Sequence, residues 1–346
     1  MTVVCPLPTV SAMIPRASAD MIDELDRRII AALQLSGRAP WSKIARWAGT
    51  SESTAQRRFN SLRERRLVHV VGAVELDRTG SASSMLVRAQ ARPGKGLQLA
   101  ELLAERPEVR FLALVTGAAD LIVDFVARDN EELLRLLHAE LPGADLITGT
   151  EHVAVIRTFT SAALWDTGLL PPEAVADLRP ARSLPYERTG WDQAPKPLSP
   201  LENAVVTELA KDGRLPVSAL ARTLDRNESS VARALDRLVE RGSLHFRTLV
   251  EPALLGYEAE FMLWLSIEPG RLEAAGRQLA EHPGTKFLAA ATGRFNLVGH
   301  MVLPRRTDLF RYTDEVIGAL PGLDASDITL HLVTLKGAWT RMDQFT

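Results

Sequence analysis

The sequence WSKIARWAGTSESTAQRRFNSLRERR, residues 41–66, decides the fold of the N-terminal region. Its apolar spacing predicts a short amphipathic helix over Trp41–Ala48 and a second helix over Ser51–Arg66. Gly49 and Thr50 predict a turn between them, and Ser51 is a typical N-cap residue. A further helix is expected upstream, over residues 23–35. Three short helices with a glycine-containing turn predict a helix-turn-helix domain.

The last of these helices has two distinct faces. At 100° per residue, Ala55, Phe59 and Leu62 cluster on one side and are expected to face the core. The opposite side carries residue types that bind base edges in the major groove, and arginines at its borders suit phosphate contact. The residues expected to contact DNA are Ser53, Thr54, Gln56, Arg57, Arg58, Asn60 and Arg63. The alternative is a solvated basic surface with no partner.

The chain repeats itself at an offset of 176 residues. Leu25–Glu75 aligns with Leu201–Glu251 without a gap, and 17 of the 51 positions are identical. Such self-similarity predicts a duplication of a unit of roughly 145 residues. In the second copy Asn227 occupies the N-cap position, and the residues expected to contact DNA are Ser229, Ser230, Arg233 and Arg237.

Charge distinguishes the two copies. The whole chain has a net charge of −2, but Leu25–Glu75 holds ten Lys/Arg against four Asp/Glu, which is +6. Leu201–Glu251 holds eight of each, which is 0. Because each neutralised phosphate adds affinity, we expect the first copy to bind DNA more tightly.

The second half of each unit predicts the strand and helix order βαββαβ. In the first copy the elements are expected at Ser83–Ala91, Lys95–Glu105, Val109–Val115, Leu121–Ala127, Asn130–Leu141 and Glu151–Phe159. In the second copy they are expected at Glu260–Ile267, Arg271–Glu281, Lys286–Ala291, Leu297–Leu303, Asp308–Leu320 and Ile328–Lys336. The predicted class is therefore α+β, with two tandem units, each a winged helix-turn-helix followed by a ferredoxin-like domain.

These assignments divide the chain into six parts. They are a leader (1–20), a helix-turn-helix domain (21–75), a βαββαβ domain (80–160), a proline-rich linker (161–197), a second helix-turn-helix domain (198–251) and a second βαββαβ domain (257–346). One helical turn is expected at residues 171–175 of the linker. The single cysteine, Cys5, excludes an internal disulfide and suits a reducing compartment. No signal peptide or membrane span is predicted, so we expect a cytoplasmic protein without a membrane partner.

This arrangement resembles the leucine-responsive regulator/AsnC (Lrp/AsnC) family of bacterial transcription factors. The resemblance covers nearly all of both units and rests on residues 25–30, Gly37-Arg38, residues 49–51, residues 62–65 and the loop Thr116-Gly117-Ala118-Ala119-Asp120. It implies a nucleoid-associated regulator that binds double-stranded operator DNA, forms a homo-oligomer through the sheets of its RAM-type sensor domains, and needs no cofactor. It also implies an amino-acid-like effector near the Gly-x-x-Asp loop. Carried over, the effector-binding residues are Thr116, Gly117 and Asp120, with Thr292, Gly293 and Asn296 in the second copy.

The two loops differ in chemistry. Asn296 replaces Asp120, which removes a carboxylate that could hold an ammonium group, and Arg294-Phe295 is bulkier than the two alanines of the first loop. The two sites are therefore not expected to share one ligand, and either of them can be empty. The alternative is a turn in which the Gly and the Asp serve backbone geometry alone.

Two rival functions remain open at this point. The first is an enzyme, because the same two-domain unit resembles sirohaem decarboxylases, which would need His with Tyr or Arg in a tetrapyrrole pocket. The strands at 111–115 and 287–291 are apolar and lack such a cluster, which counts against the enzyme, although His300 follows the second loop. A metabolite sensor or scaffold that does not bind DNA fits the neutral second copy but not the basic first one. The seven histidines are scattered along the sequence, so neither a catalytic nor a metal site is expected.

Overall fold

The computed structural model describes residues 19–80, 82–179 and 196–342. Cys5, with most of the predicted leader, and residues 180–195 of the predicted linker lie outside the described residues. No helix in the described ranges combines the length and the apolar character that crossing a bilayer requires.

The first head consists of three helices, α2 (Glu24–Leu35), α3 (Trp41–Ala48) and α4 (Glu52–Glu64), as predicted. The Asp23 side chain accepts a hydrogen bond from the backbone N–H of Asp26 to begin α2, and the Ser51 side chain accepts one from Thr54 to begin α4. Gly49, at φ 76°, ends α3 in the left-handed conformation that the turn needs. Ala55, Phe59 and Leu62 are buried beneath α4, which confirms the predicted inner face.

The second head has the same three-helix order. Its helices are α9 (Pro200–Lys211), α10 (Val217–Leu224) and α11 (Glu228–Glu240). Ser199 and Glu202 form a capping box at the start of α9, and Asn227 caps α11 by accepting from the N–H of Ser230. The core of this head includes Val231 and Leu238 of α11.

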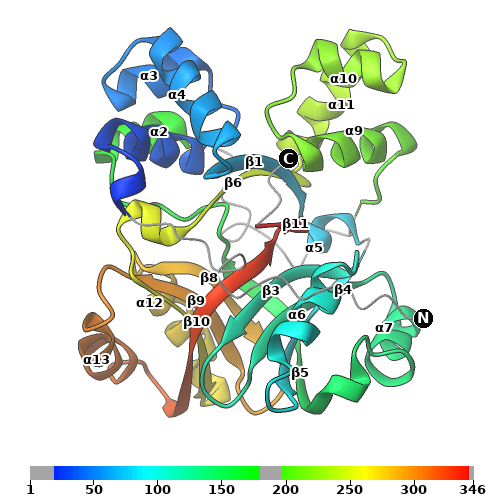
Figure 1. Cartoon of the computed structure of the whole chain (residues 1–346), viewed down its shortest axis with the longest axis vertical. Helices are drawn as coiled ribbons and strands as arrows, with labels where there is room; N and C mark the ends of the chain where they lie inside the picture. The colour runs from blue at the N-terminus through cyan, green and yellow to red at the C-terminus, as the bar shows by residue number, and fades with distance from the viewer. Residues whose placement is uncertain (1–18, 81, 180–195, 343–346) are drawn as a thin grey trace.

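Below the heads, two groups of four antiparallel strands join into one closed sheet (Figure 1). The first group is β2 (Ser83–Ala91), β3 (Val109–Val115), β4 (Leu121–Ala127) and β5 (Ile147–Thr160). The second is β7 (Ala259–Ile267), β8 (Thr285–Ala291), β9 (Leu297–Leu303) and β10 (Leu323–Gly337). β5 pairs with β8, while β10 pairs with both β7 and β3, so the sheet has no free edge between the two groups. The short β11 (Thr340–Arg341) pairs only with β10.

Helices cover the outside of the closed sheet. The longer ones are α6 (Gly96–Ala104) and α12 (Leu272–Ala280), and each packs its apolar face on the strands of its own half and on the end of the other half's last strand. The helices predicted to begin at Asn130 and Asp308 do begin there, as α7 (Asn130–Leu134) and α13 (Asp308–Arg311), but both continue with π-helical geometry. The remaining short segments are η1 (Ala19–Met21), α5 (Leu76–Thr79), η3 (Ala144–Leu146), η4 (Pro252–Leu255) and η5 (Pro269–Arg271).

The predicted wings are not separate hairpins. Each head contributes one strand, β1 (Val68–Val74) or β6 (Leu244–Val250), and these pair with each other in antiparallel register (Figure 1). The prediction of a winged domain in each unit is therefore wrong in the described residues. A lone strand leaves its backbone N–H and C=O groups unpaired, and here each strand satisfies those of the other.

Two arginines make reciprocal contacts across this interface between the heads. Arg38 Nη1 donates to the carbonyl oxygen of Gly213 at 2.8 Å, and Arg214 Nη1 donates to that of Gly37 at 2.6 Å. The Arg214 guanidinium also lies 4.1 Å from the centre of the Trp41 ring, and burial lowers the pKa of Arg214 to about 10. Since these positions differ by the repeat offset of 176, the contact is self-complementary, as in a two-fold dimer.

The first part of the predicted linker packs on the first head. Trp165, Leu170 and Leu178 are buried in the core of that head, and the predicted helical turn is the helix α8 (Pro172–Leu178). Asp177 of α8 pairs with Lys43 at 2.9 Å. Residues 161–179 are therefore a covering layer rather than a spacer between the two units.

Candidate DNA-binding and ligand-binding sites

The outer face of α4 presents the side chains predicted to contact bases. Ser53, Gln56 and Arg57 are exposed, while Thr54 and Asn60 are half-buried. Within the described part of the chain, no hydrogen bond or ion pair engages the Arg57 guanidinium. Buried Phe59 anchors α4 from below. The Arg57 cation on the exposed face of this helix therefore has the geometry needed to enter a groove.

Two other predicted contact residues of α4 point toward carboxylates. Arg58 Nη1 lies 2.8 Å from Asp23 Oδ2 and 3.5 Å from Asp26 Oδ2, and Arg63 Nη1 lies 3.4 Å from Asp212 of the second head. Asp26 is buried, and burial raises its pKa. Arg58 thus helps to hold α4 against α2, which is a structural role that the helical wheel did not indicate.

In the second head, α11 places its predicted residues in a similar way. Ser229 and Arg233 are exposed and Ser230 is half-buried, but Arg233 Nε donates to the backbone oxygen of Ser229 at 3.2 Å. Arg237 lies 3.6 Å from the buried Glu202. Both predicted arginines of α11 are thus engaged within the second head, whereas Arg57 of α4 is not engaged within the first.

Each Gly-x-x-Asp-type loop lies against the last strand of the other half. The backbone N–H of Thr116 donates to Leu330 on β10 at 2.8 Å, and that of Thr292 donates to Ala154 on β5 at 2.9 Å. Gly117 and Gly293 have φ values of 106° and 92°, so both turns need glycine. The loops thus sit where the two βαββαβ folds meet.

The polar side chains of these loops are engaged with the backbone. Asp120 Oδ2 accepts from the N–H of Ala91 at 2.8 Å. Asn296 makes the equivalent bond to Ile267 at 2.9 Å and also donates to the carbonyl oxygen of Ile267 at 2.7 Å. In both loops the side chain therefore closes a turn, as expected if the Gly and the Asp serve backbone geometry. Asp120 is nevertheless exposed to solvent.

A cavity of about 190 Å³ lies between the β1–β6 ribbon and the near end of the closed sheet. Arg110, Asp124 and His300 line it, together with Arg247 of β6. A smaller adjoining space of about 70 Å³ shares His300 and Arg247 with it. Together they are called the chamber below; the smaller space adds the charged side chains of Glu251, Glu260 and Lys286.

Two polar clusters at equivalent positions line the chamber. In the first half, Arg110 Nε donates to Asp124 Oδ2 at 2.6 Å and Arg110 Nη2 donates to the Ser84 hydroxyl at 3.1 Å. Adding 176 to these numbers gives Lys286, His300 and Glu260, which form the second cluster. There Lys286 Nζ donates to Glu260 Oε1 at 2.9 Å, and His300 Nε2 donates to the same oxygen at 2.7 Å.

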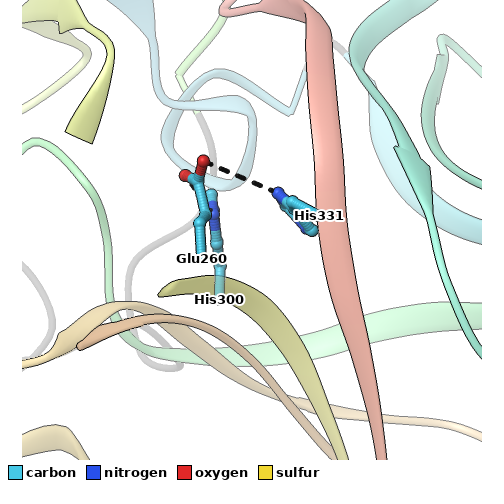
Figure 2. A group of neighbouring side chains, drawn as sticks. All are labelled: Glu260, His300 and His331. Carbon is cyan, nitrogen blue, oxygen red and sulfur yellow. Dashed lines mark hydrogen bonds and ion pairs between the residues drawn. The ribbon is translucent and has the colours of Figure 1, made fainter. Parts of the chain in front are cut away.

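Figure 2 shows that His331 of β10 joins the second cluster. Its Nδ1 lies 3.8 Å from Glu260 Oε2, and the rings of His331 and His300 have centres 4.8 Å apart. Burial lowers the pKa of His300 to about 3, so this ring is neutral at physiological pH. Burial alone would raise the pKa of Glu260, but Lys286 and His300 hold it well below its ordinary value.

Sequence reasoning missed this cluster. The expectation that the histidines form no cluster with carboxylates is wrong in the described residues, because His300 and His331 lie beside Glu260. Residues 260, 300 and 331 lie on three different strands, so only the sheet register brings them together. The available signal was the repeat itself, which places polar side chains at the same inward positions of both copies.

Comparison with protein-family models gives two matches. Residues 22–63 match the AsnC-type helix-turn-helix domain, and residues 84–163 match the Lrp/AsnC ligand binding domain. An uncharacterized HTH-type transcriptional regulator of Pyrococcus horikoshii is 32% identical over 139 residues, which are 40% of this chain and 88% of that protein. The HTH-type transcriptional regulator FL11 of the same organism is 32% identical over 141 residues, which are 40% of this chain and 91% of that protein.

The chain belongs to the Lrp/AsnC family, and carries an AsnC-type helix-turn-helix domain followed by an Lrp/AsnC ligand-binding domain. The predicted family is thus confirmed, and these relatives are archaeal. Over nearly its whole length the fold is similar to the crystal structure of the siroheme decarboxylase NirDL in co-complex with an iron-uroporphyrin III analogue, with a TM-score of 0.59. The match covers 94% of this chain and 95% of that one at 17% identity, and shows a shared fold.

Proposed function

We propose that this protein is a sequence-specific DNA-binding regulator whose DNA affinity is modulated by an amino acid or a related small metabolite. The observation that carries the proposal is the exposed face of α4, where Ser53, Gln56 and Arg57 project from a helix anchored by buried Phe59. The net charge of +6 over Leu25–Glu75 favours a polyanionic partner for this head.

The second part of the proposal is that the chain is a tandem duplication that acts as its own dimer. Support comes from the reciprocal Arg38 and Arg214 contacts, from the β1–β6 pair, and from the sheet that closes across both halves. Two unequal heads on one polypeptide would suit an asymmetric operator, whereas two identical heads suit a palindrome. Further assembly into a homo-oligomer is not needed to complete the sheet.

The effector is proposed to bind at the Gly-x-x-Asp-type loops, where each loop meets the other half. Thr116, Gly117 and Asp120 are exposed there, beside Thr329 and Leu330 of β10. A ligand at this contact would touch both halves at once, so it could favour one arrangement of the heads over another. Thr292, Gly293 and Asn296 are the candidates at the second loop.

Footprinting tests the regulator directly. The full chain is incubated with the DNA upstream of its own coding region, with and without a panel of amino acids, and Arg57→Ala serves as the matched control. A protected segment that Arg57→Ala loses, and that one amino acid alters, is the expected result. Protection that is identical for the wild type and for Arg57→Ala would contradict the assignment of α4 as the reading helix.

A second candidate function is an enzyme that resembles siroheme decarboxylase. The full-length fold similarity favours it, as does His300 in the chamber with His331 beside it. The size of the chamber argues against this function, because its two spaces of about 190 and 70 Å³ together stay below the roughly 300–1,000 Å³ of sites that enclose drug-sized ligands. Adding sirohaem and recording the Soret band distinguishes the two: a saturable shift that His300→Ala abolishes would support the enzyme, and an unchanged spectrum the regulator.

A further inference from the structure

The second polar cluster leaves buried nitrogen and oxygen atoms without hydrogen-bond partners. Both ring nitrogens of His331 lack a partner in the described chain, although the side chain is only 2% exposed. Oε1 of Glu251, a residue that lines the chamber, is likewise buried without a hydrogen-bond partner in the described chain. Buried polar atoms are nearly always satisfied, so such a concentration points to a missing ligand.

We propose that Glu260, His300 and His331 form a binding site for one divalent transition-metal ion such as Zn²⁺ or Co²⁺. Two imidazoles and one carboxylate are a donor set that such ions take, and the chamber leaves a further coordination position open toward solvent or a small ligand. The site lies in the second half only, because the equivalent positions in the first half are Ser84, Asp124 and Val155.

The sheet register explains why these three residues meet. On the neighbouring strands β7 and β9, Met262 pairs with His300, which places Glu260 and His300 on the same inner face. On the other side of β7, the register Leu330↔Phe261 brings His331 next to Glu260. His331 is also the first residue of β10 to pair with β3, so it lies at the point where the sheet closes.

The distance between Glu260 and His331 suits two ligands of one ion better than a hydrogen-bonded pair. Two bonds of about 2.1 Å that meet at a tetrahedral angle separate their donor atoms by about 3.4 Å. Here Glu260 Oε2 is 3.8 Å from His331 Nδ1, which is too far for a hydrogen bond and close to that separation. His300 Nε2 donates to Glu260 Oε1 at 2.7 Å, and an ion would take the place of this hydrogen bond. All three ligand atoms lie within 4.8 Å of one another.

The neighbours of the cluster hold its rings in place. Phe111 packs against both imidazoles, with ring centres 5.6 Å from His300 and 5.9 Å from His331. Binding through His300 Nε2 requires the ring proton to move to Nδ1, which leaves the imidazole neutral. Lys286 bonds to Glu260 Oε1, so Oε2 faces the ion while the ammonium competes with it for the carboxylate.

The test is a titration of the metal-stripped full chain with Co²⁺, followed by visible absorption and by metal analysis after gel filtration. The wild type is expected to bind one Co²⁺ per chain. His331→Ala and Glu260→Gln are each expected to weaken binding at least about 10- to 100-fold, since even outer-shell partners of a metal have effects of this size. Lys286→Met is expected to tighten it, because a competing cation is removed.

Ser84→Ala is the matched control, since it alters the equivalent position of the first cluster and should leave Co²⁺ binding unchanged. Thermal melts of each variant separate lost binding from lost folding. If a variant fails to fold, anomalous scattering from a Co²⁺-soaked wild-type crystal locates the ion directly. The proposal is overturned by the absence of a saturable one-to-one site, by unchanged affinity in folded His331→Ala, or by an ion located away from these three residues.

Discussion

The first and second halves of the chain have the same order of helices and strands, but their side chains differ in chemistry on the recognition helices and in the chamber. On the recognition helices, Arg57 is unpaired among the described residues, whereas its counterpart Arg233 bonds to its own helix. In the chamber, the trio Ser84, Arg110 and Asp124 is replaced by Glu260, Lys286 and His300. The turn at Asp120 and Asn296, in contrast, keeps the same backbone bond in both. The bond that closes this turn is thus common to both halves, whereas the recognition-helix surface and the chamber differ.

The largest expected difference between the halves is in DNA binding. Arg57→Ala is expected to abolish specific binding, because a bidentate arginine–guanine contact contributes about 1–3 kcal/mol of discrimination and the other arginines predicted to contact DNA on α4, Arg58 and Arg63, pair with carboxylates. Arg233→Ala is expected to weaken binding less, since its head has no net charge. Gel-shift titrations of both variants at one fixed salt concentration measure the two losses.

Equal losses in the two variants would refute the asymmetry of the heads. A salt titration sharpens the same comparison. Removing a phosphate contact reduces the slope of log affinity against log salt, whereas removing a base contact changes affinity mainly on the specific sequence. Arg57→Ala is therefore expected to keep most of its non-specific binding.

The second comparison concerns Glu251 and its counterpart Glu75. Burial raises the pKa of Glu251 to about 7 from an ordinary value of 4.5, while Glu75 lies 3.7 Å from His245. A carboxyl that is harder to ionise in the folded state makes the protein lose stability as pH rises from about 4.5 to about 7. The upper limit of this loss is about 3 kcal/mol, at about 1.4 kcal/mol per pH unit.

Glu251→Gln should therefore raise the free energy of unfolding at pH 8 and change it little at pH 4.5. Urea denaturation at the two pH values measures this, with Glu75→Gln as the matched control. If Glu251→Gln has the same effect at both pH values, Glu251 is not a buried acid in solution.

Much of the fold was predictable because its periodicities are local. The strands at Ser83–Ala91, Val109–Val115, Leu121–Ala127 and Leu297–Leu303 were predicted with their observed bounds. The pairing of β1 with β6 was not predicted, because the residue pattern of a strand does not specify which other strand it pairs with. β5 and β10 begin four and five residues earlier than predicted, at Ile147 and Leu323, because their first residues pair in the sheet without a strong apolar alternation.

A candidate site was predictable where its residues lie close together in the sequence, and was not where they come from distant elements. A helical wheel was enough to place Phe59 inward and Arg57 outward on α4. It did not show that Arg58 pairs with Asp23 and Asp26, which lie at the start of α2. The chamber is lined by residues more than 100 positions apart, such as Arg110 of β3 and Arg247 of β6, and only the placement of the β1–β6 ribbon over the closed sheet brings them together.

The smallest expected difference lies in the two turns. Asn296→Asp replaces an amide that donates to the carbonyl oxygen of Ile267 with a carboxylate oxygen, which places two acceptors face to face and should cost about 1–2 kcal/mol. Asp120→Asn keeps the acceptor for Ala91 and can add the second bond seen at Asn296, so its effect should stay within about 0.5 kcal/mol. Urea denaturation of both variants measures the pair. A large loss for Asp120→Asn would mean that the carboxylate has a partner beyond Ala91. A small loss accompanied by a lost amino-acid response in the footprint would separate the structural role of Asp120 from its proposed contact with the effector.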